Sequence, residues 1–165
     1  MSLSAGQFRA ALARWPSGIS VVTTRVGAVP AGMTVSAFFS VSLSPPLVAV
    51  CLDRRAATLA LIEQSGHFGV NVLSAEQRAL SERFATRDNE PVRFDGVPLH
   101  EAPGTRSPLL AGAVLQLDCQ LAAHHEAGDH VLCIGLVSAA LTHPGAPLVY
   151  HGAGYHLLTP LPGEL

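Results

Sequence analysis

Two long stretches without a single charged residue constrain the fold of this chain more than any other feature. They cover residues 26–52 and 130–163. Each is long enough for a membrane span, but Pro, Gly and Ser interrupt both before about 18 apolar residues have accumulated. We therefore expect no membrane segment. Because a monomer of this size should need more charge to cover its surface, we interpret the apolar surplus as an oligomer interface.

The composition agrees with that interpretation. Charged residues make up 13% of the 165 residues, whereas about 25% is usual for a soluble domain. A chain of this length fits one domain, which we expect to cover residues 1–165, and it can bury a substantial core. A homodimer is the simplest assembly that would cover the remaining apolar surface.

The cationic residues exclude several functions. All ten are Arg, and the chain has no Lys. This excludes a pyridoxal-phosphate Schiff base, a P-loop and a biotinyl or lipoyl attachment site. A net charge of −2 without a basic run argues against a nucleic-acid partner.

The cysteines and the first residues indicate the compartment. Cys51, Cys119 and Cys133 lie in apolar stretches without CxxC spacing, which is typical of buried thiols in a reducing compartment. Residues 1–15 lack a basic segment followed by an apolar one, so we expect no signal peptide. Together these features predict a cytoplasmic protein.

Sequence periodicity predicts a mainly β chain with a few helices. Helices are expected at residues 7–15, 56–64 and 75–85, the last capped by Ser74 with Gln77 in a capping box. Strands are expected at residues 19–24, 33–43, 47–52, 67–73, 113–124, 131–141, 148–151 and 155–158. A turn near Val29 and Pro30 should close the first strand, and residues 86–107 should be largely irregular. This order favours a closed barrel over a doubly wound fold, and no GxGxxG turn is present.

Hydroxyl groups alternate along the second predicted strand. Ser36, Ser40, Ser42 and Ser44 occupy every second or fourth position of an uncharged run. Such alternation places side chains on one face. A row of small hydroxyls on an apolar wall suits a neutral, flat, hydrogen-bonding ligand with a phosphate tail. The alternative is a solvent-facing edge strand. No GxSxG elbow accompanies these serines, so nucleophilic hydrolysis is not expected.

The eight histidines raise the question of a metal. We predict no metal site, because HExxH, CxxC and clusters at ligand spacing are all missing from the sequence. His130 ends a Gly-Asp-His turn at the mouth of a strand, where it is either a turn residue or a functional group. His151 and Tyr155 follow in the last two strands, where they could be simple rim residues.

Several segments, taken in order, resemble one known family. They are WPSGISVVTT at residues 15–24, GMTVSAF at 32–38, SVSLSPPL at 40–47 with Cys51, FGVNVL at 68–73, FA at 84–85, RF at 93–94, GDH at 128–130, IG at 134–135 and LVYH at 148–151. Together they resemble the flavin reductase-like family, the short-chain NAD(P)H:flavin oxidoreductases that supply two-component monooxygenases. The resemblance covers about residues 8–158.

The resemblance implies a fold and an activity. The fold is an FMN-binding split β-barrel with a few peripheral helices, homodimeric, with FMN or FAD in a groove near the subunit interface. The activity is hydride transfer from NADH or NADPH to the flavin, which then leaves for a partner monooxygenase. A non-catalytic flavin- or haem-binding split-barrel protein is the alternative. An oxidase acting on pyridoxine phosphate is a third candidate, which ranks low because such a site should need several cations.

The resemblance also implies site residues. Those expected to contact the flavin are Met33, Thr34, Val35, Ser36, Ala37, Ser40, Val41, Ser42, Cys51, Leu52, Asp53, Thr58, Arg83, Phe84 and Ala85. Thr58 opens a predicted helix, whose N-terminus would favour the phosphate. His130 is expected beside the nicotinamide as its positioning group, with His151 and Tyr155 at the same mouth.

One departure from the family pattern concerns the phosphates. Many relatives have an Arg directly after the His of their Tyr-His pair, whereas this chain has Gly152. Without Lys, the cations expected nearby are Arg54, Arg55, Arg83 and Arg87. The sequence does not choose between FMN and FAD, or between NADH and NADPH.

Overall fold

The computed structural model describes residues 3–86 and 90–161. Its helices are α1 (Ala5–Leu12), α2 (Ala57–Ser65) and α3 (Arg78–Ala85), with 3-10 turns η1 (Ala75–Gln77) and η2 (Glu90–Val92). Its strands are β1 (Ser17–Gly18), β2 (Ser20–Val26), β3 (Val29–Val35), β4 (Phe38–Ser42), β5 (Leu47–Asp53), β6 (His67–Val72), β7 (Leu99–Glu101), β8 (Pro108–Leu110), β9 (Leu115–Ala127), β10 (His130–Thr142), β11 (Val149–His151) and β12 (Gly154–His156). The expectation of a mainly β chain with few helices is confirmed.

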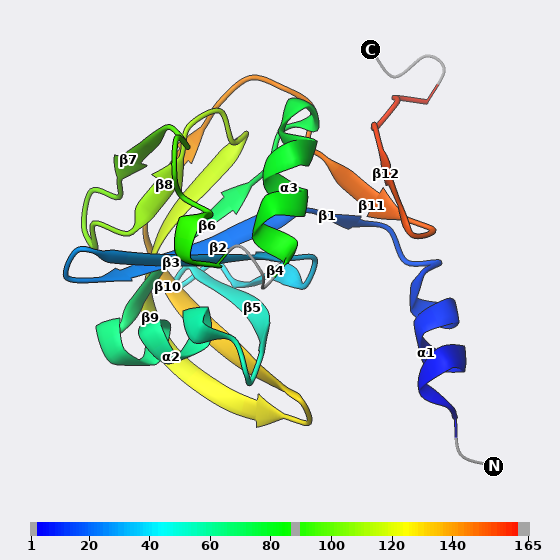
Figure 1. Cartoon of the computed structure of the whole chain (residues 1–165), viewed down its shortest axis with the longest axis horizontal. Helices are drawn as coiled ribbons and strands as arrows, with labels where there is room; N and C mark the ends of the chain where they lie inside the picture. The colour runs from blue at the N-terminus through cyan, green and yellow to red at the C-terminus, as the bar shows by residue number, and fades with distance from the viewer. Residues whose placement is uncertain (1–2, 87–89, 162–165) are drawn as a thin grey trace.

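One antiparallel sheet of seven strands forms the body, in the order β3-β2-β6-β9-β10-β5-β4. The edge strands β3 and β4 are consecutive in the chain and are joined only by Ser36 and Ala37. In a flat sheet, seven strands would place the two edges about 29 Å apart. The link between Val35 and Phe38 spans at most about 11 Å. The sheet is therefore strongly curved, and its edges approach each other where β3 passes into β4 (Figure 1).

The curved sheet encloses the main hydrophobic core. Buried side chains from β2, β3, β5, β6, β9 and β10 meet there, and Leu59 and Ile62 of α2 pack against them. Phe68 of β6 fits against Gly135 of β10 so closely that a Cβ at Gly135 would lie 2.5 Å from the phenyl Cζ. Interiors are packed at crystal-like density, so this position requires glycine.

A second, smaller core lies under α3. It contains Ile19, Leu73 and Phe84, with Leu110 and Leu148 beside them. The predicted capping box is present, because the Ser74 and Gln77 side chains each bond the other's backbone N–H. The helix nevertheless starts with the 3-10 turn η1, and α3 begins only at Arg78.

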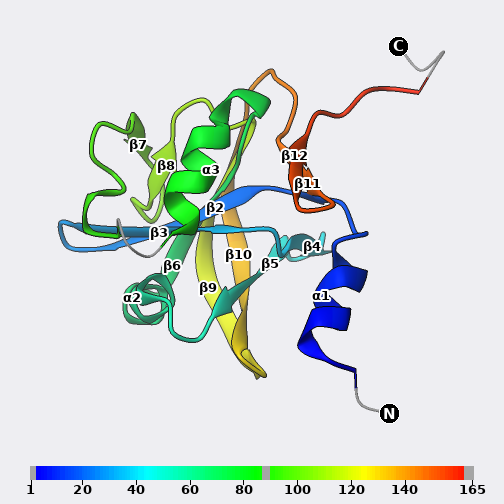
Figure 2. The ribbon, with the colours of Figure 1, turned by 45° about the vertical axis from the view of Figure 1, so that its right-hand side comes forward.

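An outlying part extends from the body. It consists of α1 and the three-stranded sheet β1-β11-β12, and both views show α1 projecting away from the large sheet (Figures 1 and 2). No residue of α1 is buried. The helix begins at Ala5, two residues before the predicted start, because Ser4 caps it in a box with Gln7.

The predicted strand at residues 33–43 is wrong as a single element. The chain runs straight from β2 through the turn at Gly27 into β3, which ends at Val35, and β4 begins after the link. Pro30 was expected in the turn but lies in β3, opposite Arg25. This is permitted because β3 is an edge strand, whose outward side needs no ladder hydrogen bond.

The helices are short. None of those within residues 3–86 and 90–161 has the length and apolar character that a membrane-crossing helix needs.

Candidate functional site

A narrow cleft lies between β3 and the end of α3. Its volume is about 50 Å³, and its walls carry Met33 and Thr34 on one side and Phe84 and Ala85 on the other. The Thr34 hydroxyl donates a 2.7 Å hydrogen bond to the carbonyl of Ser81, which ties the two walls together. Four residues that the sequence analysis assigned to the flavin are thus brought to one cleft, although they lie about fifty positions apart in the chain.

A larger groove of about 570 Å³ opens beside the link between β3 and β4. It is lined by Ser36 and Ala37, by α1 and by the β11–β12 turn, including His151. The Ala37 carbonyl accepts a 3.0 Å hydrogen bond from the Cys51 amide, which fixes the link against β5. Two predicted flavin residues and one predicted nicotinamide residue therefore share this groove.

Strand β4 lies at the sheet edge with Ser40 and Val41 exposed and Ser42 half-buried. Its pairing with β5 shifts between Ser40 and Ser42, so a bulge interrupts the alternation. In the single chain, Ser40 and Ser42 therefore lie on an edge strand that faces solvent, which was the alternative interpretation. They would line a pocket only if another surface covered β4.

Other predicted flavin residues differ in accessibility. Cys51 and Asp53 of β5 are half-buried, whereas Leu52 and Thr58 are within the core. Val35 and Phe84 are also buried. The buried side chains support the walls of the cleft and of the groove at the link. A ligand could reach atoms of Cys51, Asp53 and the exposed link.

His130 begins β10, at the tip of the long β9–β10 hairpin. Its Nδ1 lies 2.7 Å from a carboxylate oxygen of Asp129. This hydrogen bond is the main reason that the pKa of Asp129 lies below its ordinary value. Across the sheet His130 pairs with Asp53, so the residue lies beside the end of β5.

His151 and Tyr155 lie elsewhere, on the β11–β12 hairpin. The Tyr155 hydroxyl is 3.0 Å from the Ser81 hydroxyl, and the Arg78 guanidinium lies over its ring at 5.1 Å. Both views place this hairpin and the tip that carries His130 at separate ends of the molecule (Figures 1 and 2). One chain does not bring the three predicted nicotinamide residues to a common mouth.

The departure at Gly152 has a local reason. Gly152 and Ala153 form the turn of the β11–β12 hairpin with φ of 58° and 63°. Positive φ at both positions is typical of a type I′ turn, which favours glycine. The Gly152 amide also donates to the Ala13 carbonyl and so joins the hairpin to the end of α1.

Most of the predicted cations are held by protein groups. Arg54 pairs with Glu126 at 3.0 Å and Arg55 with Asp53 at 2.9 Å. Arg83 donates to the carbonyls of Val92 and Asp95. Arg87 lies outside the described residues.

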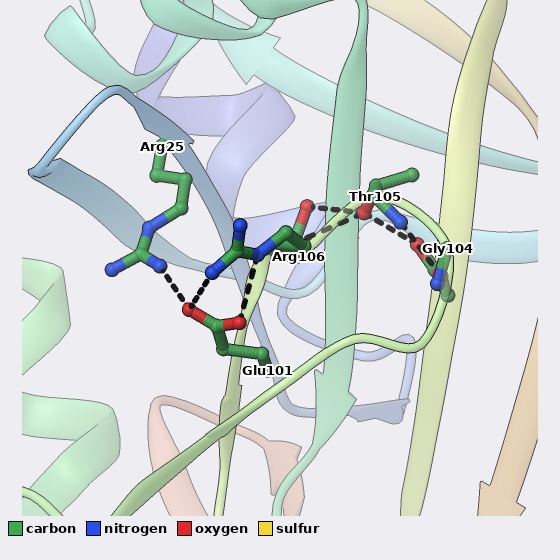
Figure 3. Close-up of polar contacts among 7 residues, drawn as sticks. Arg25, Glu101, Gly104, Thr105 and Arg106 are labelled. Atoms are coloured by element: carbon green, nitrogen blue, oxygen red, sulfur yellow. Dashed lines mark hydrogen bonds and ion pairs between the residues drawn. The ribbon is translucent and has the colours of Figure 1, made fainter.

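Arg25 and Arg106 were not assigned to the site, and both form ion pairs with one acidic residue. Both bind the carboxylate of Glu101, at 2.6 and 2.9 Å (Figure 3). This cluster lies beside β2 and β7, so it does not supply charge to either cavity.

The environment of each thiol disfavours its ionised form by raising its pKa. Burial raises the pKa of Cys119 to about 12 and that of Cys133 to about 11, and all three cysteines are free. Within residues 3–86 and 90–161, no three His, Cys, Asp or Glu side chains gather as metal ligands would.

Four lining residues of the cleft were not assigned to the flavin, namely Ala56, Thr86, Glu90 and Arg93. Arg93 lines the cleft together with Glu90, but the sequence analysis quoted Arg93 only as part of a matching segment and gave it no role. An Arg next to a Phe in an irregular stretch carries no local signal of burial.

Comparisons with known proteins agree with one another. The family model described as "Flavin reductase like domain" matches residues 12–159. The chain is 42% identical over 152 residues to the reductase component of 4-hydroxyphenylacetate 3-monooxygenase from Thermus thermophilus, covering 92% of this chain and 95% of that protein. It is 38% identical to an NADH-dependent flavin reductase from Rhodococcus sp., covering 91% and 84%.

Solved structures are similar over nearly the whole chain. Flavin reductase PheA2 superimposes with a TM-score of 0.87 at 36% identity, covering 95% of this chain and 99% of that one. The NADH:FAD oxidoreductase SgcE6 of Streptomyces globisporus, in complex with NAD and FAD fragments, gives a TM-score of 0.87 at 34% identity, covering 94% and 93%.

Proposed function

The chain belongs to the flavin reductase-like domain family, and we propose that it is the reductase component of a two-component monooxygenase. It is an NAD(P)H-dependent oxidoreductase that uses FMN or FAD, and reduced flavin leaves it for a separate oxygenase. The observation that carries this function is the family match over residues 12–159, which includes both walls of the cleft.

The residues present fit a flavin. The cleft of about 50 Å³ cannot enclose the flavin ring, but the groove of about 570 Å³ at the link can. Around the two cavities, apolar groups of Met33 and Ala37 are combined with hydroxyl and backbone groups of Thr34 and Ser36. A flat ring with carbonyl and N–H groups on its edge needs such a mixture. The chemistry that the bound cofactor supplies is hydride acceptance at N5 from C4 of the nicotinamide.

The protein's own part is to position the two rings and to exclude water. Hydride transfer between stacked rings requires no strong acid or base from the protein. We assign His130 to positioning the nicotinamide, and its hydrogen bond with Asp129 orients the imidazole.

We infer that the protein is a split-barrel homodimer. The curved sheet supports the barrel, and exposed apolar side chains support the dimer. They gather on the outlying part and on β4, and they include Phe8, Leu12, Trp15, Phe39 and Leu43. A second copy that covers β4 would turn its serine row into a pocket wall. A mouth shared by His130, His151 and Tyr155 also requires two subunits.

The first experiment measures oxidation of NADH and NADPH by the purified protein, with and without added FMN or FAD. We expect oxidation that depends on flavin, and the relative rates will rank both nucleotides and both flavins. Flavin binding, seen as quenched flavin fluorescence, without nucleotide oxidation would favour the alternative of a non-catalytic binding protein. Failure to bind any flavin would contradict both functions.

His130→Ala tests the proposed nicotinamide group. We expect kcat/KM for the nicotinamide to fall on the order of tenfold, because one positioning hydrogen bond is lost. The affinity for flavin should not change. His125→Ala is the matched control, because His125 is exposed on the same hairpin. Unchanged kinetics of His130→Ala would remove this residue from the site.

A further inference from the structure

Arg93 is a buried cation at the border of the flavin cleft. It follows η2, and only 3% of its side chain is exposed. Burying an Arg costs several kcal/mol unless other groups compensate it. The groups that the buried guanidinium binds should therefore explain why an Arg stands at this position.

The guanidinium bridges the two walls of the cleft. Nη1 donates to the carbonyl of Gly32, which directly precedes the Met33 and Thr34 wall on β3. Nη2 donates to the carbonyl of Thr86, which directly follows the Phe84 and Ala85 wall at the end of α3. The planar, rigid fork of an Arg suits two acceptors at a defined separation.

Aromatic packing keeps the bridge in place. The guanidinium lies 5.9 Å from the centre of the Phe84 ring, and Phe84 meets Phe94 edge-to-face at 5.0 Å. Phe94 also contacts β3, because a Cβ at Gly32 would lie 3.0 Å from its Cζ. Arg93 therefore binds the carbonyl of Gly32, and the absence of a side chain at Gly32 lets Phe94 pack closely against β3.

The described residues compensate the charge of Arg93 only in part. Its nearest described carboxylate, from Glu90, lies 3.9 Å away and is half-exposed. Its Nε has no hydrogen-bond partner among the described residues. A structural ion pair would normally place a carboxylate in direct contact with the fork, whereas here the fork binds two backbone carbonyls of the cleft.

We propose that Arg93 is the positioning residue of the flavin cleft, holding the segments 32–34 and 84–86 in the arrangement that presents their accessible groups to the flavin. This inference rests on the proposed function. It explains why the chain keeps a buried Arg beside a cleft that is otherwise lined mainly by uncharged groups.

The test compares Arg93→Met and Arg93→Lys with wild type and with Arg106→Met. Arg106 is the matched control, because it forms an exposed ion pair away from the cleft (Figure 3). Flavin is removed from each protein, and the dissociation constant for FMN is measured by fluorescence quenching. Melting temperature and the KM for NADH at saturating FMN are measured in parallel.

We expect Arg93→Met to raise the dissociation constant for FMN about tenfold or more, because, of the hydrogen bonds among the described residues, only that between Thr34 and Ser81 then ties the walls together. Arg93→Lys should have a smaller effect, since an ammonium keeps the charge but cannot span both carbonyls as a fork does. The KM for NADH at saturating FMN should stay unchanged, and Arg106→Met should bind FMN like wild type. A role only in stability would lower the melting temperature without this selective loss.

Other results would overturn the inference. If Arg93→Met and Arg93→Lys fold and bind FMN like wild type, Arg93 does not set the cleft. If neither variant folds, Arg93 serves the fold as a whole and the positioning role is wrong. If wild type itself binds no flavin, the proposed function fails, which is a distinguishable result.

Discussion

The curved sheet and the outlying part of this molecule differ in how they obtain stability. The sheet buries side chains of six strands and of α2 in one core, including Phe68 and Val70 with no exposed surface. The outlying helix α1 has eight residues, none of them buried. Helices this short are marginal in water unless tertiary packing supports them. The comparison teaches that the sheet is held by its own core, whereas within the outlying part the β11–β12 hairpin contacts the body through Tyr155 and α1 buries none of its residues.

The largest effect should come from the core. Phe68→Ala should lower the free energy of unfolding by about 3–5 kcal/mol, because it leaves a cavity against Gly135. Phe8→Ala, which removes an equal ring that is 51% exposed, should change it by less than about 0.5 kcal/mol. Urea unfolding of both variants, at one low protein concentration, measures the difference. Similar losses would show that the two parts do not differ as described.

A change at the outlying part should act on assembly instead. Trp15 is 74% exposed in the single chain, and Trp is enriched among residues that dominate interfaces. Trp15→Ala should raise the dimer dissociation constant about thirtyfold, equivalent to about 2 kcal/mol. Sedimentation over a range of concentrations measures this constant.

The control for that experiment is Val29→Ala. Val29 is also exposed, but it lies at the start of β3 on the large sheet. It should leave the dissociation constant unchanged. A wild-type protein that stays monomeric at high concentration would contradict the homodimer proposal. Equal effects of Trp15→Ala and Val29→Ala on the dissociation constant would show that Trp15 is not a specific part of the interface.

The smallest expected effect is a dependence of stability on pH, which arises from His67 in strand β6 of the sheet. Burial lowers the pKa of His67 below its ordinary value of 6.5, and its Nδ1 is 2.8 Å from the Ser107 hydroxyl. Below pH 6.5 the unfolded chain therefore binds a proton that the folded chain does not. Stability should be complete above this pH and should fall as the pH drops from 6.5 toward the lowered pKa.

Unfolding curves at a series of pH values measure that slope. His67→Gln, which can still bond Ser107, should flatten it between pH 6.5 and the lowered pKa. His125→Gln, at an exposed position, should keep the wild-type slope. An unchanged slope in His67→Gln would mean that other groups cause the pH dependence.

Sequence patterns predicted most elements because their signals are local. The helix at residues 56–64 ends where Gly66 adopts a left-handed φ of 73°, and the hairpin turn at Gly128 was expected from its residues. The prediction failed where the sheet edge decided the outcome. Pro30 resembles a turn residue, but it is tolerated in β3 because that strand has only one neighbour.

The candidate site was predicted only in part, because contacts between distant segments also decide which residues come together there. The resemblance identified the segments of both cleft walls, and the structure brings Thr34 and Phe84 to one cleft. It also implied a common mouth for His130 and Tyr155, which one chain does not form. Arg93 stands in a segment that carries the resemblance but received no role, because the two carbonyls that it binds are identified only by the fold.

By itself, the sequence determined that this chain is β-rich, that it belongs with the flavin reductases, and that it is poor in charged residues. Those properties depend on residue types and on short-range periodicity. Only the tertiary structure decided which strands are edges, where the cleft lies, and that a buried guanidinium joins its walls. Such features depend on contacts between residues far apart in the chain, and local preferences carry no information about which distant carbonyl a side chain will meet.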